Sequence, residues 1–367
     1  MTDYQTKTIC FFNTNKAWGG GEKWHLTTSK EFRRQGFNTI LVTNEASEMA
    51  KKGIQENLNV YRFRVGNLSF LNPIKIFIFF LFFKTKKVDT VIINLPSDLK
   101  VAGLAAKLSG VKQIIYRRGM PHPLRNTFLN RFLFSKVLTH VVVNSEEIGR
   151  NLKKGNESWF PHEKMILIYN GVDTKVSLDR SKKLLEKGED EIIIGNAGRL
   201  TEQKGQKYLI DLSKSLILEG VKFKIIIAGE GELREGLQKL IIENGLSDYV
   251  KLMGHVSDMS AFFNSLDVFV FTSLYEGSAN TLIETLQHGV PTIAWDISSN
   301  PEIIKDHVTG LLAKCGDVEE LKEKILLFMH DKELRSRCVK NGFKLIEDSF
   351  DSKKNLEKLK SLIAAKN

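Results

Sequence analysis

Two series of short apolar runs, each alternating with helical patterns, constrain the fold of this chain more than any other feature. An apolar run of about four to eight residues between turn signals is typical of a buried strand, and apolar residues three or four apart are typical of a helix. Strands that alternate with helices form parallel βαβ units, which build doubly wound α/β domains. The first series predicts strands at 7–13, 38–42, 89–94, 113–116 and 140–143, with helices at 24–35 and 98–108.

A polar segment, residues 173–190, separates the two series and has no apolar periodicity, which is typical of a linker. A chain of 367 residues also exceeds the length at which a single core usually stops growing. We therefore expect two α/β domains, residues 1–172 and 191–349. The second series predicts strands at 191–196, 222–228, 250–253, 268–271 and 291–295, with helices at 205–219, 232–244, 259–265, 280–288 and 318–330.

Positive charge is concentrated in the first domain. Residues 1–175 hold 27 of the 54 basic residues but only 13 of the 43 acidic ones, so this part has a net charge of +14 and the remainder one of −3. A basic excess of this kind favours an anionic partner, such as nucleic acid, an anionic membrane or a phosphorylated substrate. Since no helix-turn-helix, RNA-binding or zinc-finger signature is visible, we do not expect nucleic acid to be the partner.

Residues 70–87 join the apolar run Ile76–Phe83 to three lysines, Lys84, Lys86 and Lys87. Eight helical residues are ~12 Å long, whereas the hydrocarbon core of a bilayer is ~30 Å thick. The run is therefore too short to span a membrane, but its aromatic residues and lysines suit a helix that lies on an anionic membrane surface. A core helix with a basic end is the alternative.

Cysteines and the N-terminal residues bear on the compartment. Cys10, Cys315 and Cys338 form no CxxC pair or Cys/His cluster, so neither a disulfide framework nor a zinc site is indicated. Residues 1–5 lack the basic-then-apolar pattern of a signal peptide. We expect a reduced, cytoplasmic setting, with peripheral attachment to the inner face of the cell membrane.

Three loops follow expected strands, at the edge where α/β domains bind ligands. In residues 18–22, Gly20 and Gly21 let a bound group approach the backbone, although a tight strand–helix connection explains them equally well. In residues 198–205, Arg199 offers a fork of donors and Lys204 a point charge, which together suit a diphosphate. The alternative for this pair is solvated surface.

The third loop, residues 254–258, contains His255 and Val256, whose backbone groups suit the edge of a nucleobase. By itself, His255 is equally well explained as a packed or capping residue. No Asp-x-Asp spacing follows an expected strand, which disfavours a pyrophosphate bridged by Mg²⁺. We therefore expect no metal and no cofactor, with Arg199 and Lys204 providing the positive charge.

Glu276 and Glu284 flank the start of an expected helix near Asn280. A helix N terminus presents unpaired N–H groups and partial positive charge, which attract phosphate. Two carboxylates beside such a terminus can accept hydrogen bonds from sugar hydroxyls, so the arrangement suits a sugar nucleotide. A helix cap and a solvated helix charge are the alternative.

The order of these motifs along the chain resembles that of the retaining glycosyltransferases of the GT-B fold, in the family often called GT4. Each motif is weak alone, but their common order over nearly the full length is specific. The motifs are Gly19-Gly20-Gly21-Glu22, Asn170-Gly171-Val172-Asp173, Gly198-Arg199-Leu200 with Lys204-Gly205, Gly229-Glu230-Gly231, Gly254-His255-Val256, Glu276 with Glu284, Gly289-Val290-Pro291 and Pro301-Glu302.

The resemblance implies two Rossmann-like domains facing across a cleft, with a final helix, at about 350–367, that returns to the first domain. It implies a nucleotide-diphosphate sugar on the second domain, with Arg199 and Lys204 at the diphosphate and Glu276 at the sugar hydroxyls. It further implies metal-independent transfer with retention, by front-face attack assisted by the leaving diphosphate. The remaining donor contacts that it implies are Gly20 and Gly21 near the phosphates, the amides of Asn280, Thr281 and Leu282 at the β-phosphate, and Glu284 at the ribose.

Several positions depart from the family pattern. Where many relatives have a histidine after the strand that ends at Tyr116, this chain has Arg117 and Arg118, and His122 comes a few residues later. Arg118 and His122 are candidates for contact with the acceptor or the sugar, and a structural role for His122 is the alternative. Ser298 and Ser299 replace a frequent glycine pair, and Gln287 and His288 replace a typically small pair.

The expected function is therefore transfer of a hexose-type residue to a glycan or lipid-linked acceptor, in surface polysaccharide or lipopolysaccharide biosynthesis. Two rival functions remain. One is another activity of the same fold, such as that of a sugar-nucleotide epimerase or a phosphorylase. The other is a non-enzymatic basic binder of nucleic acid, which predicts strongly salt-dependent binding.

Overall fold

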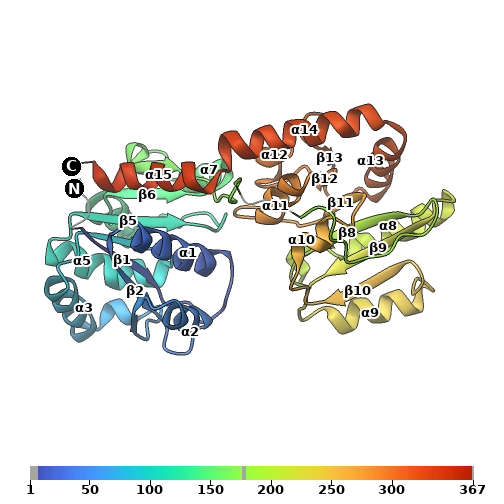
Figure 1. Ribbon diagram of the computed structural model, residues 1–367. Helices are drawn as coiled ribbons and strands as arrows, with labels where there is room; N and C mark the ends of the chain where they lie inside the picture. Colours follow the sequence, from blue (N-terminus) through green and yellow to red (C-terminus); the bar gives the residue numbers. More distant parts are fainter. Residues whose placement is uncertain (1–6, 176–178, 366–367) are drawn as a thin grey trace. The chain divides into compact units, whose positions relative to one another are not determined.

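The structure is a computed structural model that describes residues 7–175 and 179–365, and these form two compact units. The first unit comprises the chain up to Asn170 and from Asn355 onward, and the second comprises Gly171–Lys354. Each unit has one parallel sheet with helices on both faces (Figure 1). The prediction of two Rossmann-like α/β domains is confirmed.

The sheet of the first unit has the strand order β3-β2-β1-β4-β5-β6-β7. Its direction of winding reverses between β1 and β4, so the loops after these two strands diverge at the carboxyl edge. The elements are β1 Thr8–Asn13, α1 Gly20–Arg34, β2 Asn38–Thr43, α2 Glu48–Gln55, β3 Asn59–Arg62, η1 Ser69–Leu71, α3 Pro73–Thr85, β4 Thr90–Ile93, α4 Pro96–Asp98, η2 Leu99–Gly103, α5 Leu104–Ser109, β5 Gln113–Arg118, α6 Phe128–Phe132, η3 Leu133–Val137, β6 His140–Val143, α7 Glu146–Lys153, η4 His162–Lys164, β7 Met165–Leu167 and α15 Ser352–Ala364.

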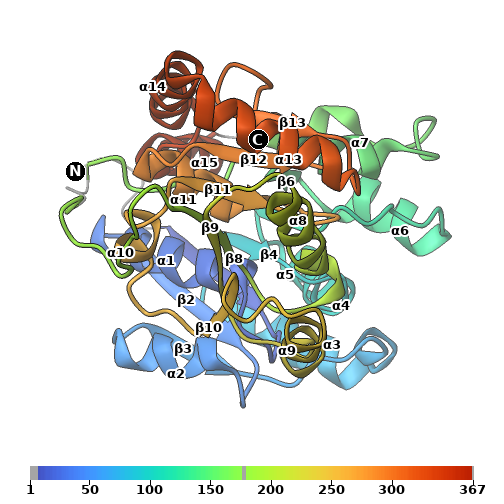
Figure 2. The same ribbon diagram turned by 90° about the vertical axis from the view of Figure 1, so that its right-hand side faces the viewer.

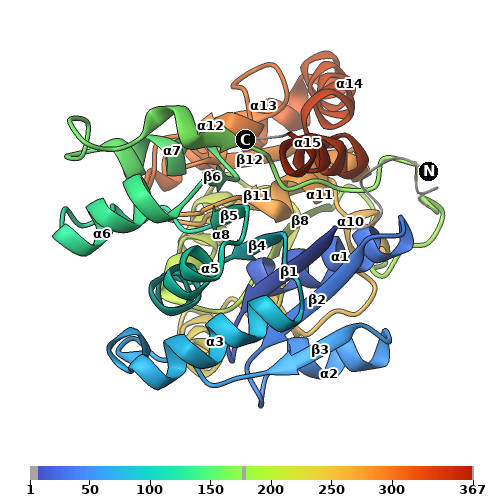
Figure 3. The same ribbon diagram turned by 90° about the vertical axis from the view of Figure 1, so that its left-hand side faces the viewer.

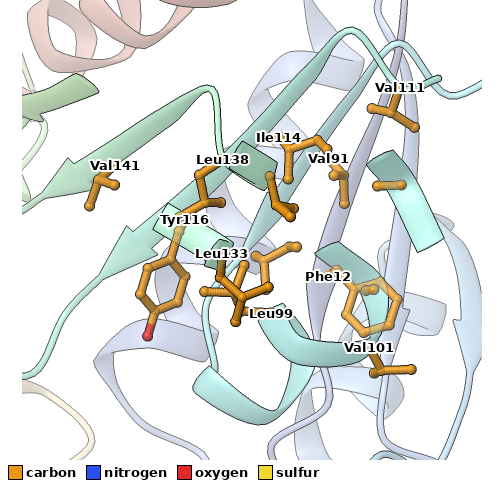
Figure 4. Close-up of a cluster of buried hydrophobic side chains, with 14 of the residues drawn as sticks. Phe12, Val91, Leu99, Val101, Val111, Ile114, Tyr116, Leu133, Leu138 and Val141 are labelled. Atoms are coloured by element: carbon orange, nitrogen blue, oxygen red, sulfur yellow. The ribbon is translucent and has the colours of Figure 1, made fainter. Parts of the chain in front are cut away.

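Alternate residues of β1 point into different layers of the first unit. Phe12 packs with α3, η2 and η3 on one face of the sheet, and part of this cluster is drawn in Figure 4. Phe11 packs on the other face, with α1, α2 and Leu359 and Ile363 of α15. The last helix of the chain therefore completes the core of the first unit.

The sheet of the second unit has the order β10-β9-β8-β11-β12-β13, and its winding reverses between β8 and β11. Figure 2 views this unit from the side on which α8 and α9 lie next to each other. Its elements are β8 Ile192–Ala197, η5 Glu202–Lys204, α8 Lys207–Leu218, β9 Phe223–Ala228, α9 Arg234–Glu243, β10 Val250–Gly254, α10 Met259–Phe263, β11 Val268–Phe271, α11 Asn280–His288, β12 Thr292–Trp295, α12 Asn300–Ile303, β13 Leu311–Ala313, α13 Val318–His330 and α14 Lys332–Ser349.

The polar segment expected to be a linker, 173–190, is instead held against the second unit. The Lys182 ammonium lies 2.5 Å from a carboxylate oxygen of Asp258, and that of Lys187 lies 2.7 Å from one of Asp267. Ion pairs of this kind leave no apolar periodicity, so the sequence pattern could not show them. Residues 176–178, within the expected linker, lie outside the described residues.

The chain crosses from one unit to the other twice, after Asn170 and after Lys354. On the side of the second unit, the segments next to these two crossings contact each other. A bridge pairs Val172 with Asp351, and Thr174 donates a hydrogen bond to the Asp351 carboxylate. A Cβ on Gly171 would lie 2.7 Å from the carbonyl oxygen of Phe350, so only glycine permits this approach. The divisions fall after Asn170 and after Lys354, whereas the sequence suggested 172 and 349.

Helix α3 has two apolar faces. Phe79 and Phe83 are buried in the core of the first unit, whereas Ile74, Phe77 and Ile78 are 68%, 57% and 44% exposed. Figure 3 shows this helix at the surface of the unit. Among the described residues, no helix is long and apolar enough to cross a membrane.

Candidate functional site

The carboxyl ends of β8 and β11 lie at the point where the winding of the second sheet reverses. The loop after β8 carries Arg199 and Lys204, and the loop after β11 carries Glu276. Loops diverge at such a point and leave a crevice for ligands. The topology therefore brings together at one edge two segments that are some seventy residues apart in the chain.

Lys204 and Glu276 form an ion pair there. Their side chains are only 16% and 9% exposed, and the Lys204 ammonium also lies 5.5 Å from the centroid of the Phe271 ring. A charge pair taken out of water requires good geometry and further partners, and a lone member of the pair would be costly to leave buried. The two residues that the sequence assigned to a diphosphate and to sugar hydroxyls are thus direct neighbours.

The two loops are also joined through their backbones. The amide of Leu274 donates to the Gln203 carbonyl at 2.8 Å, and the Thr272 hydroxyl donates to the Lys204 carbonyl at 2.9 Å. Gly205 has φ +61°, and a Cβ there would lie 2.4 Å from the carbonyl oxygen of Thr272. Glycine at this position therefore permits the close approach that positions Lys204.

Ser298 positions the backbone of Glu276 from a third loop, after β12. Its hydroxyl donates to the Glu276 carbonyl at 2.9 Å and accepts from the Glu276 amide at 3.1 Å. Ser298 has φ +58°, a left-handed conformation that glycine adopts more readily than serine. The two hydrogen bonds offset the strain of this backbone conformation at a serine. The sequence singled out Ser298 without indicating this role.

Helix α11 begins at Asn280, as expected, and no side chain caps its N terminus. The Asn280 amide donates to Ser278 and the Leu282 amide to Ala279, so these two of the three expected phosphate-binding amides have backbone partners. Glu284 lies one turn into the helix and is half-buried. Thr281, between the two engaged amides, is also half-buried.

Gln287 and His288 at the end of α11 have packing roles. Gln287 donates to the Asp173 carbonyl at 2.8 Å, and His288 joins the Glu284 carbonyl to the hydroxyl of Ser260 on α10. Burial lowers the pKa of His288. These two larger residues therefore fasten α11 to its neighbours.

Arg199, His255 and Val256 complete the edge of the second unit. Arg199 and His255 are exposed, and Val256 is half-buried. A Cβ on Gly229 would lie 1.9 Å from the carbonyl oxygen of Gly198, so the loops after β8 and β9 touch through bare backbone. This contact leaves the Arg199 side chain at the surface of the loop.

In the first unit, α1 begins at Gly20 rather than at the expected Trp24, so Gly20 and Gly21 belong to its first turn. A Cβ on Gly21 would lie 2.8 Å from the Asn94 amide nitrogen, which shows how closely α1 approaches the loop after β4. Glycine has a low helix propensity, so sequence patterns place the helix start too late. The Gly-rich turn is therefore a packing contact as well as an exposed backbone.

Glu22 anchors the same turn from inside. It is buried, and one carboxylate oxygen accepts from the side-chain amides of Asn13 and Asn15, each at 3.0 Å. Nearby, the buried Asp98 carboxylate accepts from the Thr14 amide at 2.9 Å and from its hydroxyl at 2.6 Å. Burial raises the pKa of Asp98 to about 7. None of these contacts has a sequence signature.

Arg117 is also buried in the first unit. Its guanidinium donates to side-chain oxygens of Asn94 at 3.2 Å and Asn170 at 2.7 Å, and it lies 4.3 Å from the centroid of the Trp24 ring. Burial lowers the pKa of Arg117 to about 10. The buried His25 imidazole, whose pKa burial and Arg117 lower to about 3, is neutral near pH 7.

Arg118 folds back into its own loop. It donates to the carbonyls of Met120 at 3.3 Å and His122 at 2.7 Å and to the Tyr116 hydroxyl at 3.1 Å. The Arg118 side chain is buried, whereas His122 is exposed. The structure therefore gives Arg118 a role in shaping this loop and places His122 at its surface.

Within residues 7–175 and 179–365, no group of three or more His, Cys, Asp or Glu side chains is arranged to hold a metal ion. Arg199 and Lys204 place two cationic side chains at the carboxyl edge of the second sheet.

Two family models match adjoining parts of the chain. The family described as glycosyl transferases group 1 matches residues 178–345, and that described as glycosyltransferase family 4 matches residues 18–176. These matches correspond closely to the second unit and to most of the first.

Individual proteins are similar to parts or all of the chain. The capsular polysaccharide biosynthesis glycosyltransferase CapM of Staphylococcus aureus is 30% identical over 240 residues, 62% of this chain and 59% of CapM. The lipopolysaccharide core biosynthesis glycosyltransferase LpsE of Rhizobium meliloti is 28% identical over 62% of this chain and 64% of its own. The matches thus span about six tenths of these curated relatives.

Among solved structures, Anabaena Alr3699/HepE in complex with UDP and glucose superposes with a TM-score of 0.79, covering 98% of this chain and 99% of that one. The two sequences are 19% identical, so this likeness bears on the fold. Together with the motif order and the two parallel sheets, these findings show that the chain belongs to the GT4-like, group 1 glycosyltransferases of the GT-B fold.

Proposed function

We propose that this protein transfers a sugar, with retention, from a nucleotide-diphosphate sugar to a glycan or lipid-linked acceptor. We propose that this reaction belongs to surface polysaccharide or lipopolysaccharide biosynthesis. The names of two relatives, CapM and LpsE, assign them to capsular polysaccharide and lipopolysaccharide core biosynthesis. The observation that carries the proposal is the ion pair between Lys204 and Glu276 at the reversal point of the second sheet. It puts a cation suited to phosphate beside a carboxylate suited to hydroxyls.

The ion pair suggests how the donor binds. A diphosphate that reaches Lys204 offers phosphate oxygens in place of the Glu276 carboxylate, so the ammonium stays paired. Glu276 is then able to accept a hydrogen bond from a sugar hydroxyl. Ser298 holds the backbone of Glu276 during this exchange. The binding energy of the diphosphate thereby prepares the carboxylate that orients the sugar.

The other contacts follow from position. Arg199 adds a second cation at the diphosphate, and its planar fork can bind two phosphate oxygens at once. In this proposal, the N terminus of α11, at Asn280, Thr281 and Leu282, lies towards the β-phosphate, and Glu284 lies towards the ribose. His255 and Val256 lie towards the base. HepE, solved with UDP and glucose, supports a donor of this class.

Transfer breaks the bond between the anomeric carbon and the diphosphate oxygen. Negative charge develops on the leaving diphosphate, where the Arg199 and Lys204 cations stabilise it. The acceptor hydroxyl attacks the same face, gives its proton to a leaving phosphate oxygen and so preserves the anomeric configuration. Because two side chains supply the positive charge, we propose that the reaction requires no metal ion.

The first unit provides the proposed acceptor site. The loop that contains Arg118 and His122, our candidates for contact with the acceptor or the sugar, lies at the carboxyl edge of the first sheet. In this proposal, Gly20 and Gly21 at the start of α1 lie towards the donor phosphates. The exposed apolar face of α3 and the net charge of +14 in residues 1–175 support peripheral attachment to an anionic membrane.

A transfer assay with defined donors tests the proposal. UDP-, GDP- and ADP-sugars are incubated with the protein, with and without lipid extract, and release of nucleoside diphosphate and the anomeric configuration of the product are measured. We expect acceptor-dependent release, retained configuration, full activity in EDTA and loss of activity in Glu276→Gln.

The same assay separates the rival functions. Epimerised free sugar without an acceptor would indicate an epimerase, and a requirement for inorganic phosphate would indicate a phosphorylase. Binding of DNA or RNA that falls steeply with salt, without turnover of any donor, would indicate a nucleic-acid binder.

A further inference from the structure

A basic pocket of about 590 Å³ lies at the carboxyl edge of the first sheet. It is formed where the loops after β1, β2 and β3 meet the start of α3, and three of its lining side chains are cationic. None of the described residues that line it is acidic. The lining includes Lys16, Asn44, Arg64, Ser69, Asn72 and Lys75.

The three cations are held differently. The Lys75 ammonium donates to the Arg64 carbonyl and the Ser69 hydroxyl, each at 3.1 Å, which fixes its position and leaves a third donor for a ligand. The Arg64 guanidinium pairs with Glu45 at 2.8 Å, yet its side chain is 80% exposed. Lys16 is exposed in the loop that leads from β1 to the Gly-rich turn.

The pocket is continuous with an exposed apolar surface. Leu68 lines the pocket and is 72% exposed, and Leu71 in η1 is 65% exposed. The exposed positions then continue along one face of α3 at helical spacing, because residues 74, 77, 78 and 81 are separated by three, one and three positions. The members of this outer face are Leu68, Leu71, Ile74, Phe77, Ile78 and Leu81.

Charge decides which partner suits this face. Lys84, Lys86 and Lys87 follow the outer face at the end of α3, Arg64 precedes it, and Lys75 lies between Ile74 and Phe77. A second copy of the chain laid face to face would bring these cations together, which costs energy. An anionic lipid surface pairs with the cations and accepts the apolar side chains in its interfacial layer.

We propose that the pocket binds the phosphate or diphosphate group of a membrane lipid while the outer face of η1 and α3 lies in the membrane interface. Identifying that lipid as the sugar acceptor rests on the proposed function. Since Lys16 and the Gly-rich turn belong to one loop, a lipid phosphate held here brings the attached acceptor to the edge where α1 begins.

Vesicle sedimentation with the full chain tests the proposal. Three kinds of vesicle are compared: phosphatidylcholine alone, phosphatidylcholine with a phosphomonoester lipid, and phosphatidylcholine with a phosphodiester lipid at equal surface charge. We expect little binding to the first and a preference for the phosphomonoester of about tenfold, because charge-assisted hydrogen bonds reward the exposed phosphate oxygens. Equal binding to the two anionic vesicles would overturn the phosphate pocket.

Substitutions test separately the contributions of the phosphate pocket and of the apolar outer face to vesicle binding. We expect the double variant Lys16→Ala with Arg64→Gln to lose the preference, whereas Lys112→Ala, at the amino edge of the same sheet, retains it. Ile78→Ser with Leu81→Ser should weaken binding to every anionic vesicle about tenfold or more. The matched control is Leu218→Ser, at an 89% exposed position of the second unit. Identical behaviour of test and control variants would contradict the proposal.

Two further measurements distinguish failure of the lipid-phosphate proposal from failure of the proposed function. Inorganic pyrophosphate should displace the protein from vesicles only weakly, and displacement at concentrations equal to those of the lipid phosphate would show that the source is a soluble phosphate. Binding of a nucleoside-diphosphate sugar is measured on the same preparations. Loss of vesicle binding with intact donor binding would contradict this inference alone, whereas absent donor binding would contradict the proposed function alone.

Discussion

The ammonium of Lys204 is paired with the carboxylate of Glu276 at the carboxyl edge of the second sheet, and both side chains are largely buried. Replacing Lys204 by Met leaves the Glu276 carboxylate buried without its cation. We expect a loss of about 3 kcal/mol in the free energy of unfolding, because breaking a buried pair from one side exposes the desolvation cost of the other. Urea denaturation of the single variant measures it.

A double-mutant cycle provides the control for this prediction. Lys204→Met combined with Glu276→Gln removes both charges, so most of the lost stability should return, with a coupling energy of about 1 kcal/mol or more. Lys214→Met, on the exposed face of α8, should change stability by less than about 0.5 kcal/mol. Strictly additive effects of the two substitutions would show that the pair is not coupled.

The two hydrogen bonds between Ser298 and the Glu276 backbone predict an ordered pair of variants. Ser298→Ala loses both bonds and keeps the left-handed backbone, so we expect it to be destabilised by about 1–3 kcal/mol. Ser298→Gly also loses the bonds but relieves about 1 kcal/mol of backbone strain, so it should be the more stable of the two. Thermal unfolding establishes the order, and the reverse order would contradict the role assigned to φ at Ser298.

The buried His25 predicts acid sensitivity. Burial beside Arg117 lowers its pKa from 6.5 to about 3 in the folded chain. The unfolded state therefore takes up a proton first, so this contribution to stability is present above pH 6.5 and is lost as the pH falls towards 3, at up to about 1.4 kcal/mol per pH unit. Comparison of His25→Gln with the wild type by urea denaturation should show a shallower acid slope in the variant. Parallel slopes would exclude His25 as the source.

The buried Asp98 is expected to change the free energy of unfolding with pH in the direction opposite to that of His25. Burial raises its pKa from 3.8 to about 7, so its contribution to stability is full below pH 3.8 and is lost as the pH rises through 7. Asparagine keeps the neutral shape, accepting from the Thr14 amide and donating to its hydroxyl. Asp98→Asn should therefore gain stability relative to the wild type between pH 4 and pH 7.5. A constant difference across that range would show that Asp98 does not titrate there.

Because the slopes of His25 and Asp98 oppose each other, the wild-type chain should show less change in stability between pH 4 and 6.5 than either variant. The double variant His25→Gln with Asp98→Asn removes both titrating side chains and serves as the control between pH 4 and 6.5.

Much of the architecture follows from the sequence, because strands such as Thr8–Asn13 and Val268–Phe271 are buried on both faces and therefore apolar throughout. The strands β3, β7 and β13 escaped notice, since they have three or four residues and β3 and β7 lack fully buried positions. The sequence of helix α3 suits either a core helix or a helix on a membrane surface. In the structure, one face of α3 lies in the core and the other is exposed.

The sequence proposes residues for the candidate site but does not show their contacts. The motif order singles out Lys204 and Glu276, whereas their pairing depends on the reversal of strand order between β8 and β11. The left-handed conformation of Ser298 and the buried bonds of Glu22 depend on dihedral angles and long-range packing. Sequence patterns indicate which residues are buried and how apolar residues repeat, but they do not show which distant residues contact each other.

Calorimetric titration of UDP-, GDP- and ADP-sugars into the wild type, Lys204→Met and Lys214→Met tests whether Lys204 binds the diphosphate of the donor. We expect one of these donors to bind the wild type and Lys214→Met equally and to bind Lys204→Met at least about tenfold more weakly, because a charge-assisted contact to phosphate is lost. A donor that binds Lys204→Met as tightly as the wild type would contradict this assignment, since its diphosphate would then lie elsewhere.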